Sequence, residues 1–273
     1  KISAGGQTYA LKRTKLSKEQ LQMWVYVHNQ NTQKNIQHIL PLRLTKWKTY
    51  YFTEDDHIYY LSPWVEHQET SLVNVFEHLG KIHRQTGHQF RLEKERLKKQ
   101  IHHYQEICHQ HFDSIQSYVE RFEKERYMSP IGLQVCTQFK EIQQMVGMTN
   151  AHLDLIEQQL SDEKDVFWKY CLCHGNMSMA HVVNDNGLFF LNWERAHLEN
   201  PIYDLIKWFK NELTTYDKMS FPFTKGFSQY MNTYPLSKLE LSYLIIYLLD
   251  LKTYLRNIEL HFHQDSKQSM VYE

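Results

Sequence analysis

The chain has 273 residues, which is enough to bury a substantial core as one large domain or two lobes without disulfide bonds. Its 31 Lys and Arg residues balance its 31 Asp and Glu residues, so no net charge favours binding to nucleic acid or to an anionic membrane. Hydrophobic residues make up 42% of the chain and aromatic residues 14%, whereas Gly and Pro are scarce. This composition excludes disordered, collagen-like and low-complexity proteins and predicts a soluble, helix-rich globular protein.

The cysteines predict a protein that is made in the cytoplasm and keeps its thiols reduced. They are Cys108, Cys136, Cys171 and Cys173, without Cys-x-x-Cys spacing, which argues against a secreted disulfide framework. Cys171 and Cys173 alternate on an expected strand, so both face one side of it. Four histidines on an expected helix over residues 91–124 also lack the spacing of a zinc motif, so no metal is expected there.

The longest apolar run covers residues 241–251. It is too short to span a bilayer and contains Asp250, so we expect a core helix and no membrane span. No signal peptide is recognisable. Because the chain begins at Lys1 rather than Met, we expect its first lobe to be truncated at the start.

Residues 1–66 have the pattern of a small sheet with one helix packed on it. Strands are expected at 7–12, 49–53 and 57–61, the first of them ending at Lys12. Between them, Ser17 is the expected N-cap of a helix over residues 17–29, because apolar residues recur there at helical spacing.

From Thr70 onward, apolar residues recur at helical spacing, which predicts a helix that ends at Gly87. Further helices are expected over residues 91–124, 131–160, 201–213 and 236–262. Strands are expected at 167–172, 181–183 and 188–193, the last two joined by a hairpin turn whose Asn186-Gly187 end is a strong turn signal. The order of elements predicts an α+β protein with a β-rich lobe over residues 1–66 and a helical lobe over residues 67–273, joined near Trp64 to His67.

The most informative stretch is 174–205, which contains His174-Gly175-Asn176, His181, the hairpin, Asn192-Trp193-Glu194 and Pro201-Ile202-Tyr203-Asp204-Leu205. In order and spacing it resembles the aminoglycoside-phosphotransferase and choline-kinase-like family, whose motif is His-Gly-Asp, Asn, hairpin, Asp-Trp or Asp-Leu, and Pro-x-x-Asp-Leu. Ala10-Leu11-Lys12 is similar to the family's strand lysine, residues 62–66 to its hinge, and residues 79–83 to the helix after the hinge. The resemblance implies a protein-kinase-like two-lobed fold with a catalytic loop at 174–194.

Within this superfamily the chain is most similar to the bacterial spore-coat kinase-like group, which shares a long helical insertion between the hinge and the catalytic loop. That resemblance implies a place in the endospore coat of a Bacillus-like bacterium, with other coat proteins as partners. It leaves the oligomeric state open.

Three positions depart from the family's motif. Phosphoryl transfer needs a carboxylate that accepts the substrate's hydroxyl proton and oxygen ligands that hold magnesium. The resemblance places Asn176 at the general base, Asn192 at the main magnesium carboxylate and His181 at the amide that completes the metal shell. An amide has no useful basic lone pair, and a general base typically contributes about 10² to 10⁴ in rate. We therefore expect a pseudokinase with no catalytic residue, no metal and no required cofactor.

Two other functions are compatible with the motif. An active ATP-dependent small-molecule phosphotransferase would use Glu194 and Asn192 as metal ligands, and a sensor would bind ATP without turnover. The candidate nucleotide-binding residues are Lys12, Pro63, Val65 and Glu194. Glu19 is the one carboxylate between Lys12 and Glu54 that could pair with the lysine, and Lys12 as an ordinary exposed lysine is an equal alternative. The resemblance gives His174 and Asp204 structural roles.

Overall fold

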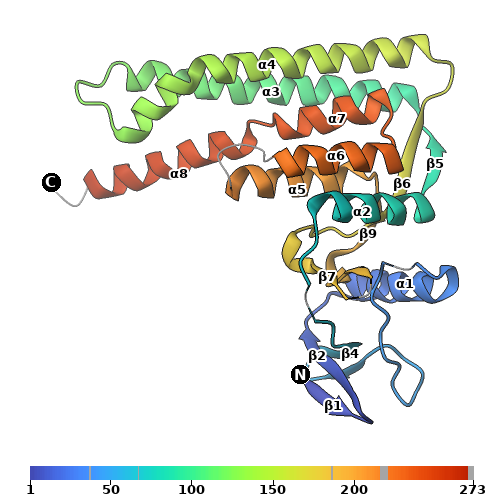
Figure 1. Ribbon diagram of the computed structural model, residues 1–273. Helices are drawn as coiled ribbons and strands as arrows, with labels where there is room; N and C mark the ends of the chain where they lie inside the picture. The colour runs from blue at the N-terminus through green and yellow to red at the C-terminus, as the bar shows by residue number, and fades with distance from the viewer. Residues whose placement is uncertain (37, 67, 186, 216–220, 270–273) are drawn as a thin grey trace. The chain divides into compact units, whose positions relative to one another are not determined.

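The computed structural model describes residues 1–36, 38–66, 68–185, 187–215 and 221–269, without the side chains of 215, 221 and 262–269. The chain divides into two compact units (Figure 1). The first comprises Lys1–Phe90 and Trp168–Ser237, and the second comprises Arg91–Phe167 and Lys238–Glu273. These units do not correspond to the predicted lobes, residues 1–66 and 67–273, which were defined by their content of strands and helices and stay a prediction. His67, at the expected junction of the lobes, lies outside the described residues.

The first unit begins with a four-stranded antiparallel sheet. Its strands are β1 (Ile2–Ala4), β2 (Gln7–Thr14), β3 (Phe52–Glu54) and β4 (His57–Pro63), in the order β1-β2-β4-β3. Strand β3 is shorter than the strand predicted at 49–53 and begins later in the sequence. Thr45 and Thr49 instead close a local turn, with a backbone hydrogen bond of 2.8 Å and a contact of 2.7 Å between their hydroxyl groups. In the β2–β4 register Lys12 lies opposite Tyr60, so both side chains leave the same face of the sheet.

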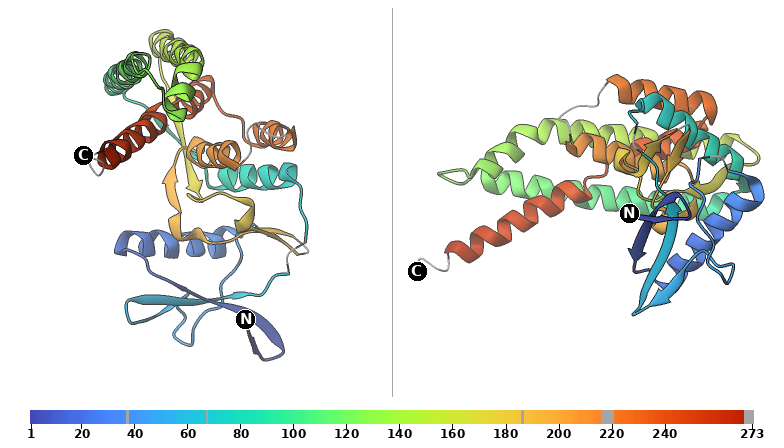
Figure 2. Two further views of the ribbon diagram at one scale, coloured as in Figure 1. Left: turned by 90° about the vertical axis from the view of Figure 1, so that its left-hand side faces the viewer. Right: turned by 60° about the horizontal axis from the view of Figure 1, so that its bottom comes forward.

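Helix α1 (Lys18–Lys34) covers that face (Figures 1 and 2). It begins at the predicted N-cap, where Ser17 forms a capping box with Gln20. The helix extends beyond the predicted end at residue 29 and stops at Asn35, whose backbone is left-handed with φ 49°. Trp24 of α1 packs on the ring of Tyr60 with the centroids 5.0 Å apart.

A three-stranded sheet and a hairpin carry the motif residues. The sheet has the order β5-β6-β9, formed by β5 (His88–Arg91), β6 (Phe167–Cys173) and β9 (His197–Glu199). The hairpin is formed by β7 (Val182–Asn184) and β8 (Leu188–Phe190), which confirms the predicted strand pair; Asn186 of its turn lies outside the described residues. Neither β5 nor β9 was expected, since such short strands have no apolar period of their own.

The helices of the first unit pack through aromatic rings. They are α2 (Leu72–Thr86), α5 (Ile202–Thr215) and α6 (Phe221–Thr233). Phe76 of α2 stacks on Trp208 of α5 with the centroids 4.1 Å apart. A Cβ atom at Gly226 of α6 would lie 2.3 Å from the Phe76 ring, so the close approach of α2 and α6 depends on this glycine.

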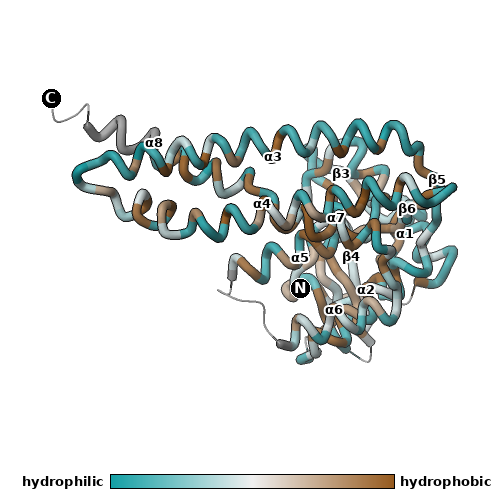
Figure 3. The backbone as a smooth tube through the Cα atoms, turned by 90° about the horizontal axis from the view of Figure 1, so that it is seen from above, coloured by the Kyte–Doolittle hydropathy of each residue, from teal (hydrophilic) through white to brown (hydrophobic). Residues whose placement is uncertain are grey.

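The second unit is helical. It contains α3 (Lys94–Phe122), α4 (Pro130–Asp162), α7 (Lys238–Leu248) and α8 (Lys252–Ser269). Short hydrophobic stretches recur along α3 between hydrophilic ones, as expected for a helix with one buried face (Figure 3). The single helix predicted over 236–262 is wrong: the chain breaks between α7 and α8, where the Asp250 carboxylate accepts a hydrogen bond from the Lys252 amide at 3.2 Å. No helix of the described residues has both the length and the apolarity to cross a membrane.

Candidate functional site

Lys12 and Asn192 meet although 180 residues separate them. The Lys12 ammonium, on β2, donates a hydrogen bond to the side-chain oxygen of Asn192 at 2.5 Å. Asn192 directly precedes the 3-10 turn η2 (Trp193–Arg195) and has a left-handed backbone with φ 63° and ψ 56°. Asn adopts this conformation more readily than most residues. The structure thus brings together two of the residues that the motif places in one site.

The segment after α1 fixes the position of the hairpin that precedes Asn192. The backbone N–H of Phe190 donates to the His38 carbonyl at 2.8 Å, and Ile39 forms a parallel bridge with Phe190. The neighbouring Leu191 N–H donates to the His181 carbonyl, also at 2.8 Å. Both sides of the strand that enters the site are therefore held by backbone bonds.

Glu194 supplies the negative charge near Lys12. Its carboxylate accepts a short hydrogen bond from the Tyr60 hydroxyl. Burial, then the charge of Glu194, raises the pKa of Tyr60 above its usual range, so Tyr60 stays a neutral donor. Burial lowers the pKa of Lys12, and the nearby Glu194 charge opposes that shift. Lys12 is thus neither an ordinary exposed lysine nor the partner of a carboxylate on α1.

Helix α1 presents neutral rings to Lys12 instead. Trp24 and His28 are both buried and lie beside Lys12 in the lining of one cavity. Burial, followed by the Lys12 charge, lowers the pKa of His28 to about 3, so the imidazole is neutral at physiological pH. Glu19, the carboxylate that was a candidate partner, is exposed in the first turn of α1 and accepts from the Ser17 hydroxyl at 2.8 Å.

The cavity beside Lys12 is small. Its volume is about 20 Å³, which is room for about one water molecule. Its lining comes from the sheet, α1, the segment after α1 and the start of η2: Lys12, Trp24, His28, Leu40, Leu42, Tyr60, Ser62, Leu191, Asn192 and Trp193. The side chains that line this cavity therefore leave little free space beside Lys12.

The predicted hinge residues lie at the end of β4 and just after it. Pro63 is the last residue of β4, opposite Tyr9, and Val65 follows it; both are half-buried. The backbone N–H of Trp64, between them, donates to the Thr8 carbonyl at 2.9 Å. They are not among the residues that line the Lys12 cavity.

Asp204, on α5, holds the start of the loop at 174–178. Its fully buried carboxylate accepts from the backbone N–H groups of His174 at 2.6 Å and Gly175 at 2.8 Å, and from His83 Nε2 at 3.3 Å. Burial alone would raise the pKa of Asp204, but the hydrogen bond and charge of His83, with His174 and Gly175, outweigh burial and lower it. These bonds connect the start of the loop to α5 and α2.

His174 joins this loop to the hairpin. Its Nε2 donates to the Leu191 carbonyl at 2.6 Å, and its Nδ1 accepts from the backbone N–H of Asn176 at 3.2 Å. These two bonds fix the neutral tautomer that carries its proton on Nε2. Burial lowers its pKa, against the attraction of Asp204. Gly175 has φ +76°, and a Cβ there would lie 2.0 Å from the Arg195 carbonyl oxygen, so the His-Gly pair requires glycine.

Three side chains bind the loop's carbonyl groups, and one of them, His181, belongs to the motif. His181 Nδ1 donates to the Asn176 carbonyl at 2.7 Å. The Lys207 ammonium donates to the Gly175 carbonyl, and the Asn211 amide to the Met177 carbonyl at 3.2 Å. Lys207 and Asn211 were not predicted as site residues, although their spacing of four on α5 places them on one face.

Comparison with known proteins supports the fold. No protein-family model and no curated protein matches the chain. Among solved structures, it is similar to an aminoglycoside phosphotransferase from Alicyclobacillus acidocaldarius, with a TM-score of 0.66 and 13% identity, over 94% of this chain and 78% of that one. Spectinomycin phosphotransferase in its AMP-bound complex has a TM-score of 0.49 and 11% identity, over 97% and 83%. Amicoumacin kinase has a TM-score of 0.48 and 14% identity, over 97% and 83%. The likeness to the Alicyclobacillus structure confirms the predicted kinase-like α+β fold.

Proposed function

We propose that this chain is a pseudokinase, a kinase-fold protein that transfers no phosphate and acts as a structural or interaction component. The observation that supports this most directly is the hydrogen bond of 2.5 Å from Lys12 to Asn192 beside a cavity of about 20 Å³. In a phosphotransferase the corresponding lysine holds phosphates and the corresponding carboxylate holds magnesium. Here the two side chains bind each other.

The chemistry of the neighbouring groups agrees with this proposal. Asn176 offers no proton acceptor at the position of the general base. His181 uses Nδ1 to hold the Asn176 carbonyl, and an imidazole is a poorer ligand for magnesium than an oxygen group. Glu194, the candidate substitute ligand, accepts from the Tyr60 hydroxyl. To bind a metal ion it would first have to lose that bond.

Thermal unfolding with and without ATP, ADP and magnesium tests the proposal. A ligand at 100 times its Kd would stabilise the folded state by about 2.7 kcal/mol, which raises the melting temperature. For a structural component we expect no shift with any of these ligands. A shift without ATP consumption would support the ATP sensor, and ATP consumption with a hydroxylated acceptor would support the active phosphotransferase.

A restored variant tests whether only the two charges are missing. The double variant Asn176→Asp with Asn192→Asp returns the two carboxylates of the family's motif. We expect it to gain a magnesium-dependent ATP shift that disappears when Lys12→Ala is added. Lys15→Ala, in the exposed segment just after β2, is the matched control and is expected to leave the shift unchanged.

We also propose the endospore coat as the place of action, with other coat proteins as partners. This rests on the resemblance to the spore-coat kinase-like group, including the long insertion that forms α3 and α4. A fluorescent fusion in a sporulating Bacillus-like host is expected to gather around the forespore. Fluorescence that stays evenly distributed in the mother cell would contradict this part of the proposal.

A further inference from the structure

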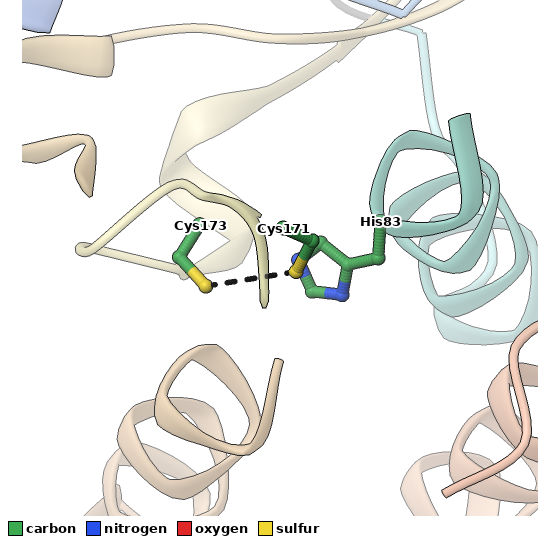
Figure 4. A group of neighbouring side chains, drawn as sticks. All are labelled: His83, Cys171 and Cys173. Carbon is green, nitrogen blue, oxygen red and sulfur yellow. Dashed lines mark hydrogen bonds between the residues drawn. The ribbon is translucent and has the colours of Figure 1, made fainter. Parts of the chain in front are cut away.

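The reactive side chains in the core of the first unit already have partners. His83 of α2 lies beside the thiols of Cys171 and Cys173 (Figure 4). Its Nε2 lies 3.3 Å from the Asp204 carboxylate, and its Nδ1 lies 2.8 Å from the Tyr230 hydroxyl. Both thiols donate to a backbone carbonyl group of β9. These contacts make the group a satisfied part of the core. A feature without such an internal explanation lies on the surface of α4, in the second unit.

The solvent-facing side of α4 carries no charge over its middle. Residues 142–153 contain no Asp, Glu, Lys or Arg, although the helix is exposed there at Gly147, Met148 and Ala151. The side chains of Met148 and Leu155 are each about half exposed. The helix packs on α3 and α7 through its opposite face. A helix face that meets only water usually carries charged residues, so this face has the character of a contact surface.

Gly147 lies at the centre of this face without a reason from its neighbours. A Cβ atom there would meet nothing within 4 Å, so no described part of the chain requires a glycine at this position. In the middle of a helix, glycine is less favourable than alanine. What glycine permits is the close approach of a second backbone, and no other described segment of this chain uses that space.

Charges of opposite sign lie at the two ends of the face. Lys140 precedes Gly147 by seven residues and Asp154 follows it by seven, so each lies about two turns, or about 10 Å, from the glycine on the same side of the helix. Both side chains are exposed, and neither forms an ion pair or a hydrogen bond within the described residues. The neighbouring Glu141 lies about 100° further around the helix, at the rim of the face.

This charge pattern is complementary to itself in one direction. When two copies of α4 cross antiparallel at Gly147, Lys140 of each copy lies beside Asp154 of the other. A parallel crossing would instead bring lysine to lysine and aspartate to aspartate. Like charges that face each other disfavour an association, so the pattern selects the antiparallel pair.

We infer that this chain forms a homodimer through α4, with the two copies antiparallel and crossing at Gly147. Such a contact is isologous and closes at two chains. Met148 and Leu155 of both copies flank the crossing and lose contact with water, which drives the association. The two pairs of Lys140 with Asp154 fix its direction and register. The inference does not depend on the proposed function, because α4 contributes no residue to the Lys12 cavity.

Sedimentation velocity of the full chain tests the dimer. A contact between two helix faces is small, so the samples cover about 1 to about 500 µM, the range in which weak interfaces dissociate. We expect the mass to rise with concentration from 33.1 kDa toward twice that value. A chain that stays monomeric throughout would overturn the inference. Continued growth beyond two chains would also overturn it, because an isologous contact cannot extend.

Charge reversal tests the direction of the contact. Lys140→Glu sets a carboxylate against Asp154 of the second copy, twice in each dimer, and should raise the dissociation constant by about tenfold. Asp154→Lys should have a similar effect. The combination of both reversals restores opposite charges, so we expect its dissociation constant to return to within about threefold of the wild type. Lys99→Glu, the same change on the exposed face of α3, is the matched control and should have no effect.

The combined variant distinguishes this face from any other. Single reversals without effect, or a combination as weak as the single variants, would show that the chain does not associate in the inferred manner. Because both positions are exposed, we expect each variant to fold, and circular dichroism of each sample checks this.

A substitution at the centre tests the crossing point. Gly147→Glu places two like charges where the copies approach most closely, while glutamate favours a helix more than glycine does. We expect this variant to keep its helix content and its stability in dilute solution but to remain monomeric at every concentration. A dimer of unchanged dissociation constant would show that the copies do not cross at Gly147.

Discussion

The hydroxyl of Tyr60 donates to the carboxylate of Glu194, and this bond connects the central strand β4 to the turn that follows Asn192. Tyr60 also lies opposite Lys12 in the sheet, with the Lys12 ammonium 5.9 Å from its ring centroid. One residue therefore positions both the cation and the anion of the site.

The variant Tyr60→Phe keeps the ring and removes the donor. Since a hydrogen bond to a charged group contributes about 1.5–3 kcal/mol, we expect a loss of that order in the free energy of unfolding. Urea denaturation measures it. Tyr59→Phe, on the opposite face of the same strand, is the matched control, with an expected effect below about 0.5 kcal/mol. Equal effects of the two variants would contradict the importance of the Glu194 bond.

The left-handed backbone of Asn192 predicts an order among its variants. Asn192→Ala and Asn192→Gly both lose the bond to Lys12, but only alanine is strained at φ 63°. The alanine variant should therefore be less stable than the glycine variant by about 1 kcal/mol. The comparison uses denaturation midpoints of the two variants. The opposite order would mean that this residue does not keep its left-handed conformation in solution.

Replacement of glycine by alanine should have opposite effects on stability at two positions. At Gly175 a Cβ atom meets the Arg195 carbonyl and the backbone is strained, so Gly175→Ala is expected to cost more than about 3 kcal/mol. At Gly147, inside α4, a Cβ atom meets nothing within 4 Å, so Gly147→Ala should stabilise by about 0.5–1 kcal/mol. Thermal melts of the two variants test both signs. A stable Gly175→Ala protein would show that the loop at 174–178 differs from this description.

The buried His28 predicts acid sensitivity. Its pKa is about 3 in the folded chain, against about 6.5 in the unfolded chain. Between these values the unfolded state binds more protons, so stability is complete above pH 6.5 and falls by about 1.4 kcal/mol per pH unit as the pH decreases. Urea denaturation from pH 7.5 to 5 measures the slope. His28→Gln should reduce the slope by about one proton, whereas the exposed His103→Gln should not.

Local signals in the sequence predicted the elements that depend on few residues. The N-cap at Ser17 and the Asn-Gly turn placed α1 and the β7–β8 hairpin, because caps and tight turns are set by local chemistry. The motif spacing placed Lys12 and Asn192 in one site. The break between α7 and α8 was missed because apolar residues continue through it with helical spacing.

Long-range pairing limited the rest of the prediction. The strand β9 has three residues and exists because Cys171 to Cys173 of β6 pair with it. Similarly, His28 lies in a predicted helix with apolar residues at helical spacing. Only the fold shows that this histidine, rather than the carboxylate of Glu19, lies beside Lys12. The contacts of His83 with Asp204 and Tyr230 likewise join three segments that share no sequence motif.

Three consecutive carbonyl groups, at residues 175 to 177, each accept a hydrogen bond from a side chain of Lys207, His181 or Asn211. A loop restrained at every peptide has few alternative conformations left to lose. Because Gly175 and Met177 are also buried, loss of one of these donors would leave a carbonyl group without a partner inside the protein.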